Sequence, residues 1–197
     1  MSKMTARLAL AAALLAAAGT ASAHTGHGTL GFFAGLAHPL ASDHLLAMVA
    51  VGAWAAVASH GAKRALAPLA FVAAMLTGAV LAAAWGTSAL ALPLVEVSIA
   101  LSVVLMGAML VWARRLVPQA GLLLIAAMGA LHGIAHGAEL PAGSSFVSYA
   151  AGFVLTTALL HAVGLWAGMR WAQAPLSRWR LAGTSLAGAG LVLLAGV

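Results

Sequence analysis

The chain has 197 residues, of which 64% are hydrophobic and only 6% charged, and its mean hydropathy is +1.08. This composition excludes a soluble globular domain of this length and predicts an integral membrane protein. The formal net charge of +6 is interpreted as a signal of membrane topology, and it does not call for a nucleic-acid partner. The absence of cysteine excludes disulfide bonds and thiolate metal ligands.

Residues 1–23 have the pattern of a cleavable secretory signal peptide. A short positive region is followed by the apolar run LALAAALLAAA and by an A-x-A cleavage motif at residues 21–23. The run is shorter than the roughly 20 residues that a membrane span needs, which argues against an uncleaved first helix. Cleavage would leave residues 24–197 as the mature domain. Its free amino group, His24 and His27 are then expected to capture a metal ion.

Six apolar segments follow and predict an all-α membrane protein with six transmembrane helices, at residues 29–59, 65–86, 90–112, 118–140, 144–169 and 180–196. Basic residues follow the first, third and fifth segments, namely Lys63, Arg64, Arg114, Arg115, Arg170, Arg178 and Arg180. The loops after the second and fourth segments have none. By the positive-inside rule the basic loops are cytoplasmic. Both mature termini are therefore expected on the periplasmic side of a bacterial inner membrane.

The first apolar segment contains the stretch HPLASDHLLAMVAVG at residues 38–52, with ionisable side chains near its start. Pro39 disfavours helical geometry in the residue before it, so His38 is expected on a bent entry segment. Asp43 and His44 lie about 7 to 9 Å further along, in the outer half of the bilayer. An ionisable group at that depth costs about 2.5 to 3.5 kcal/mol and needs a partner or a ligand. Met48 shares the face of His44 and is a possible weak thioether ligand.

The fourth segment contains the stretch LHGIAHGAEL, in which His132, His136 and Glu139 are spaced i, i+4 and i+7. This spacing places all three on one helical face, at the same outer depth as the first motif. Glu96, near the start of the third segment, is expected in the same layer, either as a ligand or as a carboxylate that orients a histidine.

Three small residues, Gly129, Gly133 and Gly137, form a second stripe on the fourth segment. Such stripes allow helices in membranes to approach closely, so this one is interpreted as a packing surface.

Imidazole and carboxylate donors without thiolates favour a divalent transition metal such as nickel, cobalt, zinc or copper(II). His161, alone in the fifth segment, has two open interpretations: a histidine that is hydrogen-bonded within the bundle, or an accessory ligand. His60 lies in a basic loop and is assigned no role.

The two histidine motifs, together with six spans and a signal peptide, resemble the HupE/UreJ family of nickel and cobalt permeases. The resemblance implies a secondary permease for Ni²⁺ or Co²⁺, with the ion as transported substrate and no permanently bound cofactor. It also implies metal-handling roles for the residues that match the family motifs, which are His38, Asp43, His44, His132, His136 and Glu139. The chain departs from the family at one point. Four residues separate His38 from Asp43, where the family usually has five, including a glycine.

Other functions remain open at this stage. The chain has no P-loop, so transport would depend on the membrane potential or on proton exchange. The favoured interpretation is a non-enzyme, but an intramembrane metal-dependent hydrolase could use the same histidines with Asp43 and Ser42. The missing HExxH motif argues against that hydrolase. A membrane cytochrome is a third class. A homo-oligomer is compatible with the sequence.

Overall fold

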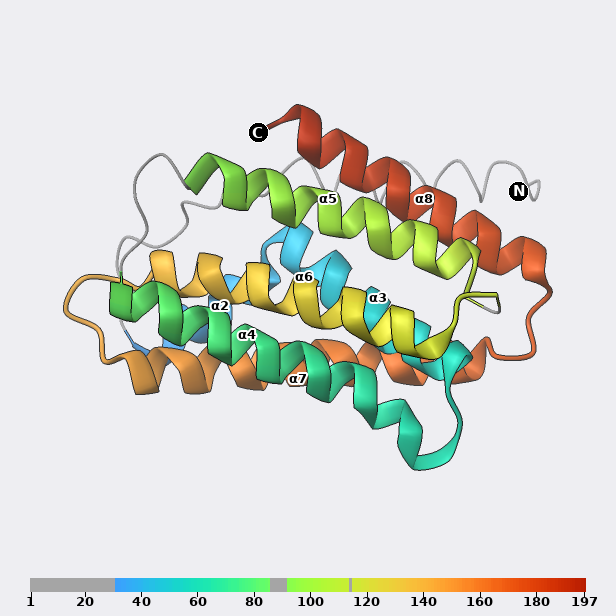
Figure 1. Cartoon of the computed structure of the whole chain (residues 1–197), viewed down its shortest axis with the longest axis horizontal. Helices are drawn as coiled ribbons and strands as arrows, with labels where there is room; N and C mark the ends of the chain where they lie inside the picture. The colour runs from blue at the N-terminus through green and yellow to red at the C-terminus, as the bar shows by residue number, and fades with distance from the viewer. Residues whose placement is uncertain (1–30, 86–91, 114) are drawn as a thin grey trace.

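The computed structural model describes residues 31–85, 92–113 and 115–197. Every regular element in these ranges is helical, which confirms the predicted all-α class (Figure 1). The elements are α2 (Phe32–Ala37), η1 (His38–Leu40), α3 (Ser42–Ala58), η2 (Gly61–Ala65), α4 (Leu66–Trp85), α5 (Leu92–Val111), α6 (Pro118–Ala138), α7 (Phe146–Arg170) and α8 (Leu176–Ala195). The signal peptide at residues 1–23, together with His24 and His27, lies outside the described residues.

Several of these helices are long and apolar enough to cross a membrane. Within the described ranges they are Gly61–Trp85, Pro93–Val111, Pro118–Ala138 and Phe146–Arg170, and the bent pair Phe32–Leu40 and Ser42–Ala58 makes a fifth if it counts as one span. The 20 residues of α4 extend about 30 Å, which matches the hydrocarbon core of a bilayer. The chain is therefore a multi-pass membrane protein.

The sixth predicted span, at residues 180–196, corresponds to most of α8. This helix begins four residues earlier than predicted, at Leu176, and its first turns carry Arg178 and Arg180. The two arginines lower the hydropathy of a helix that is otherwise long enough to span, and α8 is not among the candidate spans. A sixth crossing therefore stays a prediction.

The first predicted span is broken near its start. Ala41 has φ −55° and ψ 141°, an extended conformation that separates η1 from α3, and the two parts of the span meet at 77°. Pro39 lies in η1 and the Ala41 amide donates to the His38 carbonyl oxygen at 3.1 Å, so the break is a tight local turn. A bend near the start of the span is thus confirmed, but the expected non-helical geometry of His38 is wrong, because its backbone is helical (φ −55°, ψ −49°) and the break falls at Ala41. Thr156 of α7 holds the short α2 in place by donating to the Leu36 carbonyl oxygen at 2.9 Å.

The remaining helices pack in pairs, with α4 against α6, α5 against α8 and α3 against α7 (Figure 1). The α4–α6 contact is built on the glycine stripe. A Cβ atom at Gly129, Gly133 or Gly137 would meet backbone atoms of α4, at Phe71, Met75 and Ala79 respectively. The interpretation of this stripe as a packing surface is confirmed. The close contact also fixes the position of the α6 histidines relative to α4.

We expect Gly133→Ala to destabilise the folded protein by about 1–3 kcal/mol, because the new methyl group must displace the backbone at Met75. Gly188→Ala is the matched control, since nothing lies within 4 Å of a Cβ atom at that position on α8. Thermal unfolding of both purified variants in detergent measures the difference. Equal melting temperatures would contradict the proposed packing role.

The two ends of the bundle differ in charge. Several basic residues lie at the end where α3 and α7 terminate (Figure 1), namely Lys63 and Arg64 of η2, Arg115 between α5 and α6, Arg170 at the end of α7, and Arg178 and Arg180 near the start of α8. His44 and His136 lie at the opposite end, near the start of α3 and the end of α6. This separation agrees with the sequence-based assignment of basic loops to one side and the histidine motifs to the other.

Candidate metal centre

His38, His44 and His136, here termed the three-histidine cluster, come from η1, α3 and α6. One ring nitrogen from each residue can be chosen so that all three lie within 4.8 Å of one another. The ring centroid of His38 lies 4.9 Å from that of His44 and 4.4 Å from that of His136, and the rings of His44 and His136 are 5.3 Å apart. The break in the first span makes this arrangement possible, because η1 turns His38 back towards α3 and α6.

Asp43 accepts two hydrogen bonds from its neighbour His44. The Asp43 Oδ1 atom lies 2.8 Å from His44 Nδ1 and 2.6 Å from the His44 backbone nitrogen. Because an ionised carboxylate can only accept, Nδ1 of His44 carries the proton and the lone pair of the neutral ring lies on Nε2. These contacts are those of a carboxylate that orients a histidine, as is common at metal sites, and the role of Asp43 as a direct ligand stays a prediction.

Glu139 likewise places a carboxylate near the Nδ1 atom of a cluster histidine, His38. Its Oε2 atom lies 3.7 Å from His38 Nδ1, and the side chains of His38 and Glu139 are 15% and 33% exposed. Glu139 follows the last residue of α6, so the cluster has a carboxylate at its partly open side. When both are ionised, the carboxylates of Glu139 and Asp43 place two negative charges beside the cluster, equal in number to the charge of one divalent cation.

His132 lies one turn before His136 on α6 and is fully buried. Its ring centroid is 4.8 Å from that of His44, and its Nδ1 donates to the Met128 carbonyl oxygen at 2.9 Å. The i, i+4 pair thus shares a face, as the spacing predicted. His132 lies beside the three-histidine cluster and is not one of the three residues whose ring nitrogens converge.

The buried ring nitrogens at this end of the bundle lack partners among the described residues. They are Nε2 of His38, His44 and His132, and both ring nitrogens of His136. A buried polar atom without a hydrogen bond costs about 1–3 kcal/mol, so a convergent group of them indicates a ligand that accepts their lone pairs. Neutral imidazole nitrogens of this kind are the commonest metal ligands in proteins.

The structure does not bring every candidate residue to the cluster. Glu96 lies on an exposed part of α5, because a common depth does not fix the side of a helix on which a residue lies. Met48 is buried in the apolar core, and its backbone carbonyl oxygen accepts from His161 Nδ1 at 2.8 Å. His161 is thus hydrogen-bonded within the bundle, which was one of its two interpretations.

Sequence reasoning missed the aromatic residues that surround the cluster. Phe153 of α7 stacks on His136, with ring centroids 4.3 Å apart and an interplanar angle of 14°. Tyr149, one turn earlier, is 1% exposed, and its ring lies 6.2 Å from that of His38 and 6.4 Å from that of His136. One signal in the sequence could have indicated Tyr149. It is the single tyrosine of the chain and lies within an apolar segment, where a buried hydroxyl group usually needs a polar partner.

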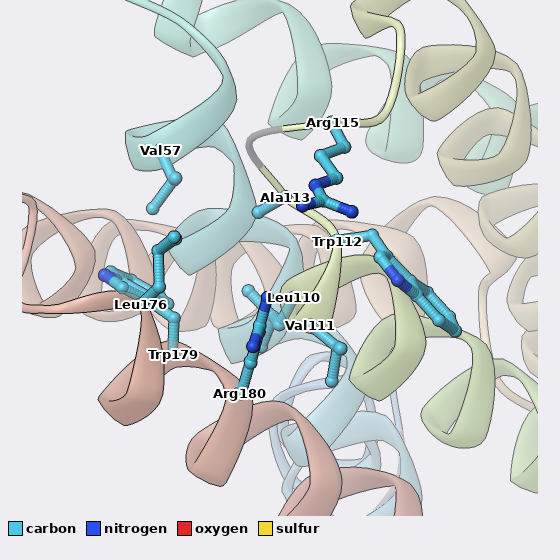
Figure 2. Close-up of a pocket in the computed structure, with 9 residues that line it drawn as sticks. All are labelled: Val57, Leu110, Val111, Trp112, Ala113, Arg115, Leu176, Trp179 and Arg180. Atoms are coloured by element: carbon cyan, nitrogen blue, oxygen red, sulfur yellow. The ribbon is translucent and has the colours of Figure 1, made fainter.

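Two hollows lie at the opposite end of the bundle from the three-histidine cluster. The smaller, of about 40 Å³, lies between the ends of α3 and α5 and the start of α8, where Arg115 and Arg180 contribute to its lining (Figure 2). The larger, of about 510 Å³, is lined in part by His60 and Arg64. Neither lining includes an aspartate or a glutamate, and both include arginine, which repels cations. The three-histidine cluster therefore remains the better candidate for a metal site.

The fold and this cluster define a multi-pass helical membrane protein with a buried group of imidazoles suited to a divalent metal ion. Comparison with known proteins agrees with that class. Residues 12–193 match the HupE/UreJ protein family. The chain is also 39% identical over 186 residues to the protein HupE of Rhizobium leguminosarum bv. viciae, covering 93% of this chain and 95% of that protein. No solved structure matches the chain.

The chain belongs to the HupE/UreJ family, as its two histidine motifs indicated. The family is associated with nickel and cobalt uptake for hydrogenase and urease. It is a family of metal transport and accessory proteins, and the comparisons give no support to a hydrolase.

Proposed function

We propose that this protein is a secondary permease that takes up Ni²⁺, or Co²⁺, across the cytoplasmic membrane. The main support for this proposal is the convergence of three imidazoles from η1, α3 and α6 at one end of the helix bundle. One ring nitrogen from each lies within 4.8 Å of the other two. An isolated buried histidine often forms only a hydrogen bond, whereas three converging rings with unpartnered nitrogens favour a shared ligand.

The donor set favours the late first-row divalent metals. Imidazole is a good ligand for nickel, copper and zinc, whereas magnesium and calcium prefer oxygen ligands. Three nitrogen donors also leave coordination positions free for water. A site with retained water exchanges its ion more readily than a closed structural site, as transport requires.

The two carboxylates support this proposal through charge. Taking a dication out of water is costly, and Asp43 and Glu139 together offset two positive charges near the cluster. Asp43 also makes His44 a better donor, because the hydrogen bond to Nδ1 fixes the tautomer and raises the basicity of the ring. The exposed part of Glu139 marks the side from which an ion would enter.

The membrane potential can drive inward movement. A dication gains about 4.6 kcal/mol per 100 mV when it moves to the negative side, twice the value for one elementary charge. Proton exchange is an alternative coupling. In this proposal the histidine end faces the periplasm, the basic end faces the cytoplasm, and both mature termini are periplasmic.

Nickel binding by the purified full-length protein tests the proposed site. We expect X-ray absorption at the nickel edge to show nitrogen and oxygen ligands, with the multiple scattering typical of imidazole and with no sulfur shell, because the donors are histidines. His44→Ala should remove part of the imidazole signal and weaken binding in equilibrium dialysis. The exposed loop residue His60 provides the control substitution, His60→Ala, which should match the wild type. Binding that depends on His60 and not on His44 would contradict the proposed site.

A further inference from the structure

A second pair of buried imidazoles meets at Phe71 of α4. The ring of Phe71 lies 5.3 Å from that of His132 and 5.1 Å from that of His161. All three side chains are at most 2% exposed. Because His132 is also 4.8 Å from His44, a continuous line of ring contacts leads from the three-histidine cluster through His132 and Phe71 to His161.

This line runs towards the middle of the bundle. His161 follows the start of α7 at Phe146 by 15 residues, or about 22 Å along the helix axis. His132 precedes the end of α6 at Ala138 by only six residues, or about 9 Å. Since the start of α7 and the end of α6 lie at the same end of the bundle, His161 is the deeper residue (Figure 1).

Hydrogen bonding leaves His161 prepared to accept a cation. Its Nδ1 donates to the backbone carbonyl oxygen of Met48 at 2.8 Å, so the lone pair of the neutral ring lies on Nε2. That Nε2 atom is buried and has no partner among the described residues. His132 has the same arrangement, with Nδ1 bonded to the Met128 carbonyl oxygen and Nε2 unpartnered. In each of these two rings, Nδ1 forms a hydrogen bond within the bundle and Nε2 is free to bind a cation.

We propose that His161 forms an inner ion station, which receives the metal from the three-histidine cluster by way of His132 and past the ring of Phe71. This inference rests on the proposed transport function and adds a second binding position to it. Conduction requires sites that bind well enough to admit an ion and weakly enough to release it, and neighbouring sites with similar donors meet that need. The cluster would hold the ion on arrival, and His161 would hold it transiently on its way inward.

The experiment separates loading of the outer cluster from passage through the membrane. Full-length protein is reconstituted in sealed vesicles with an inside-negative potential, and the initial rate of radioactive nickel uptake is measured. Nickel binding to the same purified protein is measured by equilibrium dialysis. The variants are His161→Ala, His161→Asn and His136→Ala, with His60→Ala as the matched histidine control.

His161→Asn is the decisive variant. The asparagine amide can donate to the Met48 carbonyl oxygen as Nδ1 does, but it has no atom in the place of the Nε2 lone pair. We expect His161→Asn and His161→Ala to keep the high-affinity nickel binding of the three-histidine cluster and to take nickel up at least about tenfold more slowly. His136→Ala should lose both binding and uptake.

Two results would overturn the inner station. A wild-type uptake rate in His161→Asn would show that only the hydrogen bond to Met48 matters. Loss of nickel binding together with uptake in His161→Asn would show that His161 supports the outer cluster and does not receive the ion. Absence of nickel uptake by the wild type, or full uptake by His136→Ala, would instead overturn the proposed function and this inference with it.

Discussion

Replacing His136 by alanine is expected to reduce nickel uptake to the background of cells without the protein. His136 contributes one of three converging imidazoles, and both of its ring nitrogens are buried without a partner among the described residues. Its removal would therefore delete a proposed ligand without breaking a hydrogen bond in the part of the chain that the structure describes. Loss of a supporting residue alone typically costs about 10–100-fold in metal affinity, and loss of a ligand should cost at least as much.

Radioactive nickel accumulation by whole cells, at matched amounts of protein in the membrane, measures this effect. The ring of His136 also stacks on Phe153, so a second variant, His136→Phe, keeps an aromatic ring in that place and guards against a folding defect. Both variants should fail to accumulate nickel, and His60→Ala should accumulate it normally. Uptake by His136→Phe at the level of His60→Ala would remove His136 from the path.

Asp43→Asn is expected to raise the nickel concentration needed for half-maximal uptake by about 10–100-fold. Asparagine has nearly the same volume, and its side-chain oxygen can still accept from His44 Nδ1. What is lost is the negative charge that balances the dication and strengthens His44 as a donor. Asp43→Ala, which also loses the hydrogen bonds that orient the ring, should have the larger effect.

The concentration dependence of uptake in cells distinguishes these variants. An order of wild type, then Asp43→Asn, then Asp43→Ala supports both an electrostatic and an orienting role for the carboxylate. If Asp43→Asn shows the concentration dependence of the wild type, the charge does not contribute. Asp43 would then have only a local structural role at the start of α3.

Much of the site could be predicted from residue spacing. The i, i+4 spacing of His132 and His136 fixes a shared helical face whatever the tertiary packing. Pro39 indicates that the span bends near its start, although the break falls at Ala41 and not at His38. The glycines of α6 likewise indicate a close helix contact, which the structure places against α4. These features depend on local backbone geometry, which sequence patterns encode well.

Features that depend on the rotation and pairing of helices could not be predicted. Glu96 shares a depth with the histidines, but depth does not determine whether a helix turns that residue inward, and α5 leaves it exposed. The hydrogen bonds that Asp43 accepts from His44 depend on the rotamers of both side chains, which residue spacing does not determine. The contact of Phe71 with both His132 and His161 joins three helices and has no motif in the sequence.

We propose that a divalent metal ion crosses the membrane through the three-histidine cluster. Nickel flux into sealed vesicles that contain only the purified protein tests it most directly, with the inside-negative potential as the one driving force. We predict saturable uptake that increases with the potential and is absent when His38, His44 and His136 are all replaced by alanine. Uptake that persists in vesicles with this triple variant would contradict transport through the cluster. So would vesicles with the wild-type protein that take up no more nickel than protein-free vesicles.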